Sequence, residues 1–176
     1  SLKDEDFVSK LFVANTHDTL LCFSSYGKVY WIKVYRLPRG GRNAKGRPIV
    51  NLLPLEKDER IQAVLPVKEF NDDQFIFMAT ETGSVKKTKL SAYSRPMKSG
   101  IKAIKLRDGD RVVNAEITDG SKEIMLFSNS GKSIRFKESD ARPMGRVSQG
   151  VRGMRIDKDQ KIISLVVLEE GNILVA

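Results

Sequence analysis

Cysteine and histidine are nearly absent from this chain of 176 residues, which has one of each, Cys22 and His17. A single cysteine excludes an internal disulfide, and the shortage of both residue types excludes the usual structural zinc sites. Long apolar runs are also missing, since Ile162–Leu168 covers about a third of the roughly 20 residues that a membrane-spanning helix needs. Ser1–Asp6 has no basic-then-apolar leader. These absences predict a cytoplasmic protein in a reducing environment, with no membrane partner.

Acidic residues are missing from two long windows of the sequence. Residues 28–50 carry seven bases and no acid, and residues 84–107 carry eight bases and no acid. A third window, residues 132–155, carries seven bases against two acids, so the rest of the chain holds 9 bases and 20 acids. Such a separation is typical of an electrostatic footprint for a polyanion, provided that the fold brings the three windows onto one surface.

A repeat in the sequence meets that condition. Gly27, Gly83 and Gly131 each follow an apolar segment, and a lysine stands six residues after each of them. Every unit then has a second glycine, a short apolar stretch, a polar turn and another apolar segment. The units recur after 56 and 48 residues, a spacing typical of four-stranded propeller blades. We predict one all-β, propeller-like domain with an incomplete array of about three blades, at residues 11–56, 60–106 and 111–156, with 160–176 opening the next.

Alternation assigns the two faces of the strand that follows each hairpin glycine. The tight turns favour a positive φ at Gly27, Gly83 and Gly131. Successive side chains of a strand point to opposite faces, so the fourth and sixth residues after the glycine share one face. These residues are Trp31 and Lys33, Lys87 and Lys89, and Arg135 and Lys137. We predict that the basic pairs face solvent, although Lys86 and Thr88 stand where a core would need apolar side chains.

Three strings of the sequence resemble one known family. Leu11–Ser25, Gly46–Leu55 and Val151–Met154 are similar to the C-terminal domain of the A subunit of bacterial DNA gyrase, and the resemblance covers the whole chain. It implies a fragment of about half of a six-bladed β-pinwheel, a propeller-like disc with strands exchanged between blades. In that family the basic rim wraps DNA with positive handedness and lets the enzyme introduce negative supercoils.

The resemblance also implies which chemistry lies elsewhere. The family's catalytic tyrosine sits in another domain and its ATPase in the partner subunit, so no tyrosine of this chain inherits a catalytic role. The sequence itself has no carboxylate, metal or nucleophile constellation typical of an active site. We therefore expect a non-catalytic fragment of a type II topoisomerase subunit, with no cofactor or metal. Its expected partners are double-stranded DNA, the gyrase B subunit, and the remainder of the gyrase A subunit.

The basic windows supply the candidate DNA-binding residues. Lysines and arginines at fixed positions in each blade would meet phosphates without reading base identity. The candidates are Lys28, Lys33, Arg36, Arg39, Arg42, Lys45, Arg47, Lys87, Lys89, Arg95, Lys98, Lys132, Arg135, Lys137, Arg142 and Arg146. The alternative is a propeller-type interaction module whose basic strips bind an acidic protein.

Overall fold

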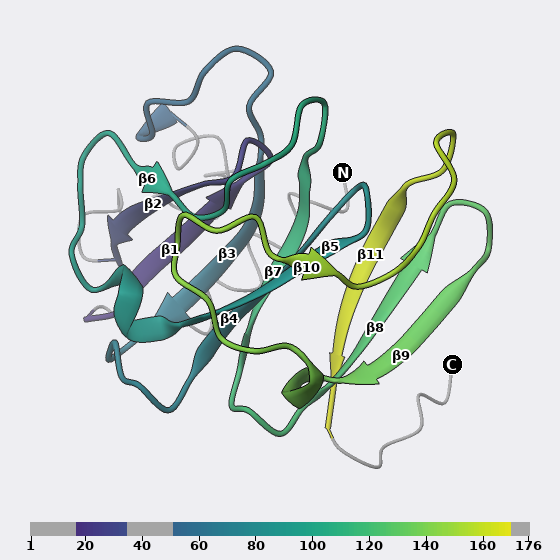
Figure 1. Ribbon diagram of the computed structural model, residues 1–176. Coiled ribbons are helices and arrows are strands. Elements are labelled where there is room, and N and C mark those ends of the chain that lie inside the picture. The colour runs from purple at the N-terminus through teal and green to yellow at the C-terminus, as the bar shows by residue number, and fades with distance from the viewer. Residues whose placement is uncertain (1–16, 35–50, 170–176) are drawn as a thin grey trace, which may run out of the picture.

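The computed structural model describes residues 17–34 and 51–169 of the chain, and Figure 1 shows them as a succession of twisted sheets. The described part contains eleven β-strands and two short 3-10 helices. The elements are β1 (Thr19–Ser24), β2 (Lys28–Lys33), β3 (Ile61–Val67), β4 (Phe75–Thr80), β5 (Ser84–Lys89), η2 (Leu90–Tyr93), β6 (Ile101–Lys102), β7 (Val112–Thr118), β8 (Glu123–Ser128), β9 (Ser133–Lys137), η3 (Glu138–Asp140), β10 (Val151–Arg152) and β11 (Ile162–Leu168). The predicted all-β class is confirmed.

The strands form three antiparallel sheets that follow one another along the chain. Their strand orders are β3-β1-β2-β6, β10-β5-β4-β7 and β11-β8-β9. β6 lies in the chain between β5 and β7, yet it pairs with β2 of the first sheet. In the same way, β10 follows β9 in the chain but pairs with β5 of the second sheet (Figure 1). Each of these two short strands is therefore exchanged into the preceding sheet, and the predicted propeller-like β-pinwheel is confirmed.

The sheets divide the chain at other points than the predicted units. β3, β7 and β11 lie at the predicted starts of new units, but each pairs along its length with the first strand of the preceding hairpin, β1, β4 or β8. The reason is that a repeat period gives the length of a unit and not the point at which it begins.

The hairpins have the conformation that their glycines predict. Gly27, Gly83 and Gly131 have φ values of 78°, 94° and 85°. This left-handed region costs glycine little and strains other residues. Each hairpin places its two strands in direct register, as in the pairing of Cys22 with Tyr30 and of Met78 with Lys86.

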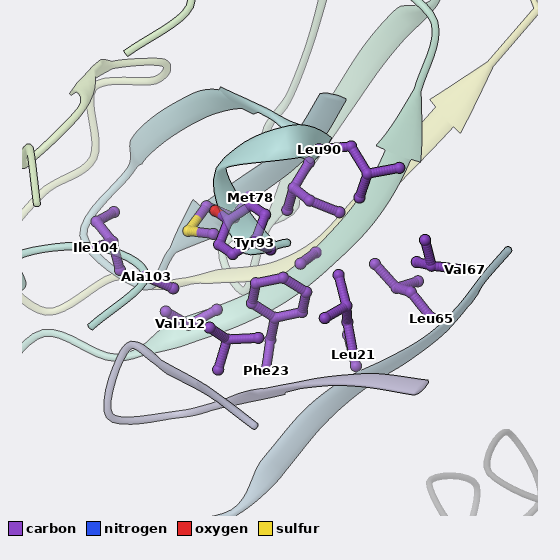
Figure 2. Packing of buried hydrophobic residues seen from close by; sticks show 14 residues of the cluster. Leu21, Phe23, Leu65, Val67, Met78, Leu90, Tyr93, Ala103, Ile104 and Val112 are labelled. Carbon is purple, nitrogen blue, oxygen red and sulfur yellow. The ribbon is translucent and has the colours of Figure 1, made fainter. Parts of the chain in front are cut away.

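Neighbouring sheets pack face to face through apolar side chains. One cluster joins Leu21, Phe23 and Leu65 of the first sheet to Met78 of the second sheet and to Tyr93 of η2, the 3-10 helix that follows β5 (Figure 2). The rings of Phe23 and Tyr93 meet edge to face, with centroids 5.6 Å apart. A second cluster joins the second sheet to the third in the same manner. Interior strands are consequently covered on both faces, and all six residues of β1 are buried.

Burial also explains the single thiol. Cys22 lies in β1 with no exposed surface, and burial raises its pKa to about 12. A thiol with that pKa stays protonated and unreactive at neutral pH. Within the described residues, no helix is long and apolar enough to cross a membrane.

Candidate nucleic-acid interface

The structure places eleven of the sixteen candidate DNA-binding residues. The five others, Arg36, Arg39, Arg42, Lys45 and Arg47, lie outside the described residues. Seven of the eleven are exposed: Lys89, Arg95, Lys98, Lys132, Arg135, Lys137 and Arg142. Lys28, Lys33 and Arg146 are partly buried, and Lys87 is buried. Most of the eleven described candidates are therefore exposed, and Lys87 is the one among them that is buried.

Lys87 does not face solvent, and this part of the prediction is wrong. Its exposed fraction is 4%. Its Nζ donates a hydrogen bond of 3.2 Å to the Glu138 carbonyl oxygen and lies 4.0 Å from Glu138 Oε2. It also lies 4.9 Å from the centroid of the Phe75 ring. Alternation separates the two faces of β5 correctly, but both faces meet protein, since Lys86 donates to the carbonyl oxygens of Ala103 and Arg146 on one face and Lys87 contacts Glu138 on the other.

Glu138 is held in place to receive this lysine. Its side chain is fully buried, and Oε1 accepts hydrogen bonds of 2.8 Å from the N–H groups of Gly120 and Lys122. Removing one partner of a buried ion pair leaves an uncompensated charge, so such pairs fix the arrangement of the elements that carry them. The Lys87–Glu138 pair therefore connects β5 to η3 and holds the third sheet against the second.

In the first sheet, the residue at the fourth position after the hairpin glycine also connects its strand to the next unit. Trp31 is partly buried, and its Nε1 donates a hydrogen bond of 2.8 Å to the carbonyl oxygen of Tyr93 in η2. Trp31 and Lys87 both reach the 3-10 helix of the next unit. Their equivalent in the third sheet, Arg135, forms an ion pair with Glu123 on the neighbouring strand β8. This position connects elements of the fold rather than forming a row of unpaired cations.

Lys86 occupies the opposite face of β5 and is even more deeply buried, at 1% exposure. Its Nζ donates to the carbonyl oxygen of Ala103 at 2.6 Å and to that of Arg146. Burial and the nearby Arg146 guanidinium lower the pKa of Lys86 to about 7. The lysine that interrupts the predicted apolar face is therefore satisfied by two backbone carbonyls, one in each of the segments that lead into or out of an exchanged strand.

The sixth position is divided between internal bonding and exposure. Lys33 is partly buried, and its Nζ donates a hydrogen bond of 2.7 Å to Thr19 Oγ1. Lys89 and Lys137 are exposed at the ends of β5 and β9. Of the three lysines at this position, two are therefore exposed, and Lys33 is hydrogen-bonded within the first sheet.

Sequence reasoning missed the bases carried by the exchanged strands. Lys102 of β6 pairs directly with Lys28, the residue after the first hairpin glycine. Arg152 of β10 pairs with Ser84 at the equivalent place in the second sheet. Lys105 and Arg155, three residues further on, are also exposed. A two-residue strand has no readable period, but a base two and five residues after Gly100 and after Gly150 is a signal that the sequence does contain.

Several acids of the turns are used inside the fold. Glu59 is buried and accepts hydrogen bonds from the Tyr30 hydroxyl at 3.0 Å and 2.9 Å. Asp110 is buried and accepts from the hydroxyl of Thr82 at 2.7 Å. Among the described residues, no group of histidine, cysteine, aspartate and glutamate is placed to hold a metal ion.

Comparisons with known proteins agree on one family. The model of the DNA gyrase C-terminal domain, a beta-propeller, matches residues 18–68, 74–119 and 122–169. The chain is 55% identical over 174 residues to the A subunit of DNA gyrase from Salmonella typhimurium, a match that covers 98% of the chain and 20% of that protein. It is 54% identical over 176 residues to the A subunit of DNA gyrase from Escherichia coli, covering 99% of the chain and 20% of that protein.

Solved structures give the same result for the fold. The C-terminal domain of DNA topoisomerase IV superposes with a TM-score of 0.81 at 31% identity, over 89% of this chain and 49% of that one. A DNA gyrase A C-terminal domain superposes with a TM-score of 0.70 at 27% identity, over 88% of this chain and 49% of that one. The chain thus spans about half of these solved domains and about a fifth of the curated relatives.

Proposed function

We propose that this chain, which belongs to the DNA gyrase C-terminal domain family, binds double-stranded DNA along its basic outer edge without reading sequence and bends the duplex around it. The observation that carries the proposal is the set of cations at the outer strands of successive sheets. Lys102 lies on the edge strand β6 opposite Lys28 of β2, Arg152 lies on the edge strand β10, and Lys132 precedes the edge strand β9, which ends at Lys137.

Backbone contacts explain how such an edge would hold DNA. Each cation that neutralises a phosphate releases condensed counterions, and this gain does not depend on the base sequence. A smooth bend of a 20–30 bp site costs on the order of 1–6 kcal/mol, so several contacts distributed along a curved edge are needed to offset it. The successive sheets of this chain would supply such an edge, since each of them carries exposed cations.

The proposal places the chain within a larger enzyme. In the intact protein this part would wrap DNA in the cytoplasm to support negative supercoiling by a type II topoisomerase. It would act there together with the gyrase B subunit, and with the rest of the gyrase A subunit. The fragment itself would contribute binding and no catalysis. Its role is to present a bent duplex to groups that other parts of the enzyme carry.

A salt titration tests the proposal. We expect random duplexes of equal length and similar flexibility to bind alike, within the roughly 1000-fold that marks the low end of specific binding. Since each phosphate contact adds about 0.9 to the slope of log K against log salt, engagement of four bases gives a slope of about −3.6. Fluorescence anisotropy with labelled duplexes from low to physiological salt measures both quantities.

An acidic polypeptide provides the comparison for the alternative function. Poly-glutamate of matched charge should bind more weakly than the duplex, because it lacks the spacing of phosphates along a stiff double helix. Tighter binding to poly-glutamate, or a strong preference for one DNA sequence, would contradict the proposal and favour a protein-interaction module.

A further inference from the structure

The exchanged segments carry bases at equivalent places in two units. In the second unit, Lys102 and Lys105 stand two and five residues after Gly100. In the third unit, Arg152 and Arg155 stand at the same distances from Gly150. All four side chains are exposed. The exchanged segments therefore repeat a pair of cations that the hairpin register does not contain.

The residues between these bases anchor each segment to the preceding hairpin. The N–H groups of Ala103 and Ile104 donate to the carbonyl oxygen of Gly27 at 2.7 Å and 3.3 Å. The N–H groups of Gly153 and Met154 donate to the carbonyl oxygen of Gly83 at 2.8 Å and 3.2 Å. The pattern of donors and acceptor is the same in both joints. Each pair of cations is thus fixed at the same place relative to its hairpin.

Burial of the same residues turns the cations outward. Ala103 and Ile104 are each 1% exposed and belong to the core between the first and second sheets. Met154 is 8% exposed and belongs to the core between the second and third sheets. An apolar anchor between two bases leaves the flanking side chains in solvent. The two segments are also connected, because the N–H of Lys105 donates to the carbonyl oxygen of Ser148 at 3.1 Å.

These four bases keep their charge available for a ligand. Within residues 17–34 and 51–169, none of the four forms an ion pair. By contrast, Arg135 forms an ion pair with Glu123, and Lys161 Nζ lies 3.5 Å from Glu81 Oε2. A cation already paired with a carboxylate must give up that partner to bind a phosphate. An exposed cation on an anchored backbone has no such partner to give up, and little conformational entropy of the chain is lost when it binds.

We infer that the exchanged segments, through Lys102, Lys105, Arg152 and Arg155, form the principal phosphate-binding track of this chain, and this inference rests on the proposed DNA binding. The bases come from one unit but lie on the sheet of the preceding unit. A duplex that contacts them therefore bridges the joint between two sheets, and binding stabilises that joint because the ligand favours the assembled form.

The test replaces all four bases by glutamine in the full chain of 176 residues. We expect the slope of log K against log salt for a random duplex to fall in magnitude by about 0.9 per lost contact, or up to about 3.6. The matched control replaces Lys57, Arg60, Lys68 and Lys158, which are exposed and lie in or beside the turns. It removes the same net charge and should leave most of the slope in place.

A second variant separates lost phosphate contacts from altered folding. It exchanges lysine and arginine at the four positions (K102R, K105R, R152K and R155K), keeps every charge and should retain the slope of the unchanged chain. Two results would contradict the proposed track without affecting the proposed DNA binding of the unchanged chain. One is equal slopes for the glutamine variant and the control variant, and the other is loss of the slope in the charge-preserving variant. No duplex binding by the unchanged chain would overturn both proposals.

Discussion

Replacing Gly83 by alanine is expected to lower the free energy of unfolding by roughly 2–6 kcal/mol, because backbone strain and overpacking add at this position. Gly83 has a φ of 94°, and a Cβ built on it would lie 2.2 Å from the carbonyl oxygen of Met154. That oxygen belongs to the backbone of the segment that β10 anchors to the second sheet. The chain can accept alanine only by moving the exchanged segment away. Urea denaturation followed by circular dichroism measures the loss.

Gly131 provides a matched control in the third sheet. Its φ is 85°, nearly that of Gly83, but a Cβ there would meet no atom within 4 Å. Gly131→Ala should therefore cost only the left-handed backbone conformation, about 1–2 kcal/mol. Gly27→Ala should lie between the two, since its Cβ would meet Ile104 Cγ2 and the Ile104 carbonyl oxygen at 3.0 Å. Equal losses at all three glycines would show that the exchanged segments do not pack on the hairpins as described.

Stability should rise with pH from neutral to alkaline conditions because of Lys86. Its pKa is about 7 in the folded protein, against 10.5 for an ordinary lysine. The unfolded state therefore binds more protons between these two values, and the contribution of Lys86 becomes more favourable as pH rises through that window. Below pH 7 both states are protonated, and the cost of the buried charge is present in full. Between pH 6 and pH 9 the gain is roughly 2–3 kcal/mol.

Lys86→Met isolates this contribution from the other titrating groups. The variant loses the two hydrogen bonds to the Ala103 and Arg146 carbonyl oxygens at every pH, so this loss does not change with pH. We measure the free energy of unfolding of both proteins in urea at pH 6, 7.5 and 9. The value for the unchanged chain minus the value for the variant should increase as pH rises. A difference that is constant across this range would contradict the lowered pKa.

The hairpins could be predicted from the sequence because their determinants are local. A glycine with a positive φ, preceded and followed by apolar alternation, defines a hairpin without reference to the rest of the chain. Gly27, Gly83 and Gly131 meet this description, and all three turns have the expected conformation. The packing of Trp31 was also within reach, since an indole among apolar neighbours is more often core than ligand.

The exchange of strands could not be predicted in the same way, because it is a long-range event. β6 and β10 are two residues long, and their partners lie about seventy residues earlier in the chain. Only the approach of Gly100 to the Tyr30 ring and of Gly150 to Val85 shows why a glycine precedes each exchanged strand. No local pattern shows which hairpin that glycine will touch.

The burial of Lys87 shows a second limit of periodicity. Alternation tells which residues share a face, and it placed Lys87 opposite Lys86 correctly. It does not tell whether a face meets solvent or another sheet. In β5 both faces meet protein, so one lysine is satisfied by carbonyl oxygens and the other by Glu138. A charged residue in a strand of a stacked array is therefore weaker evidence that its face meets solvent than the same residue in a single sheet.

The central claim is that this chain wraps DNA, and a topology assay tests it most directly. The full chain is bound to relaxed circular DNA at low salt, a nicking-closing enzyme relaxes the unconstrained part, and the linking number is read after the proteins are removed. The account predicts a shift of the topoisomer distribution that grows with the amount of bound chain and is lost in the variant without Lys102, Lys105, Arg152 and Arg155. An unshifted distribution on DNA shown to be saturated with the unchanged chain would contradict it.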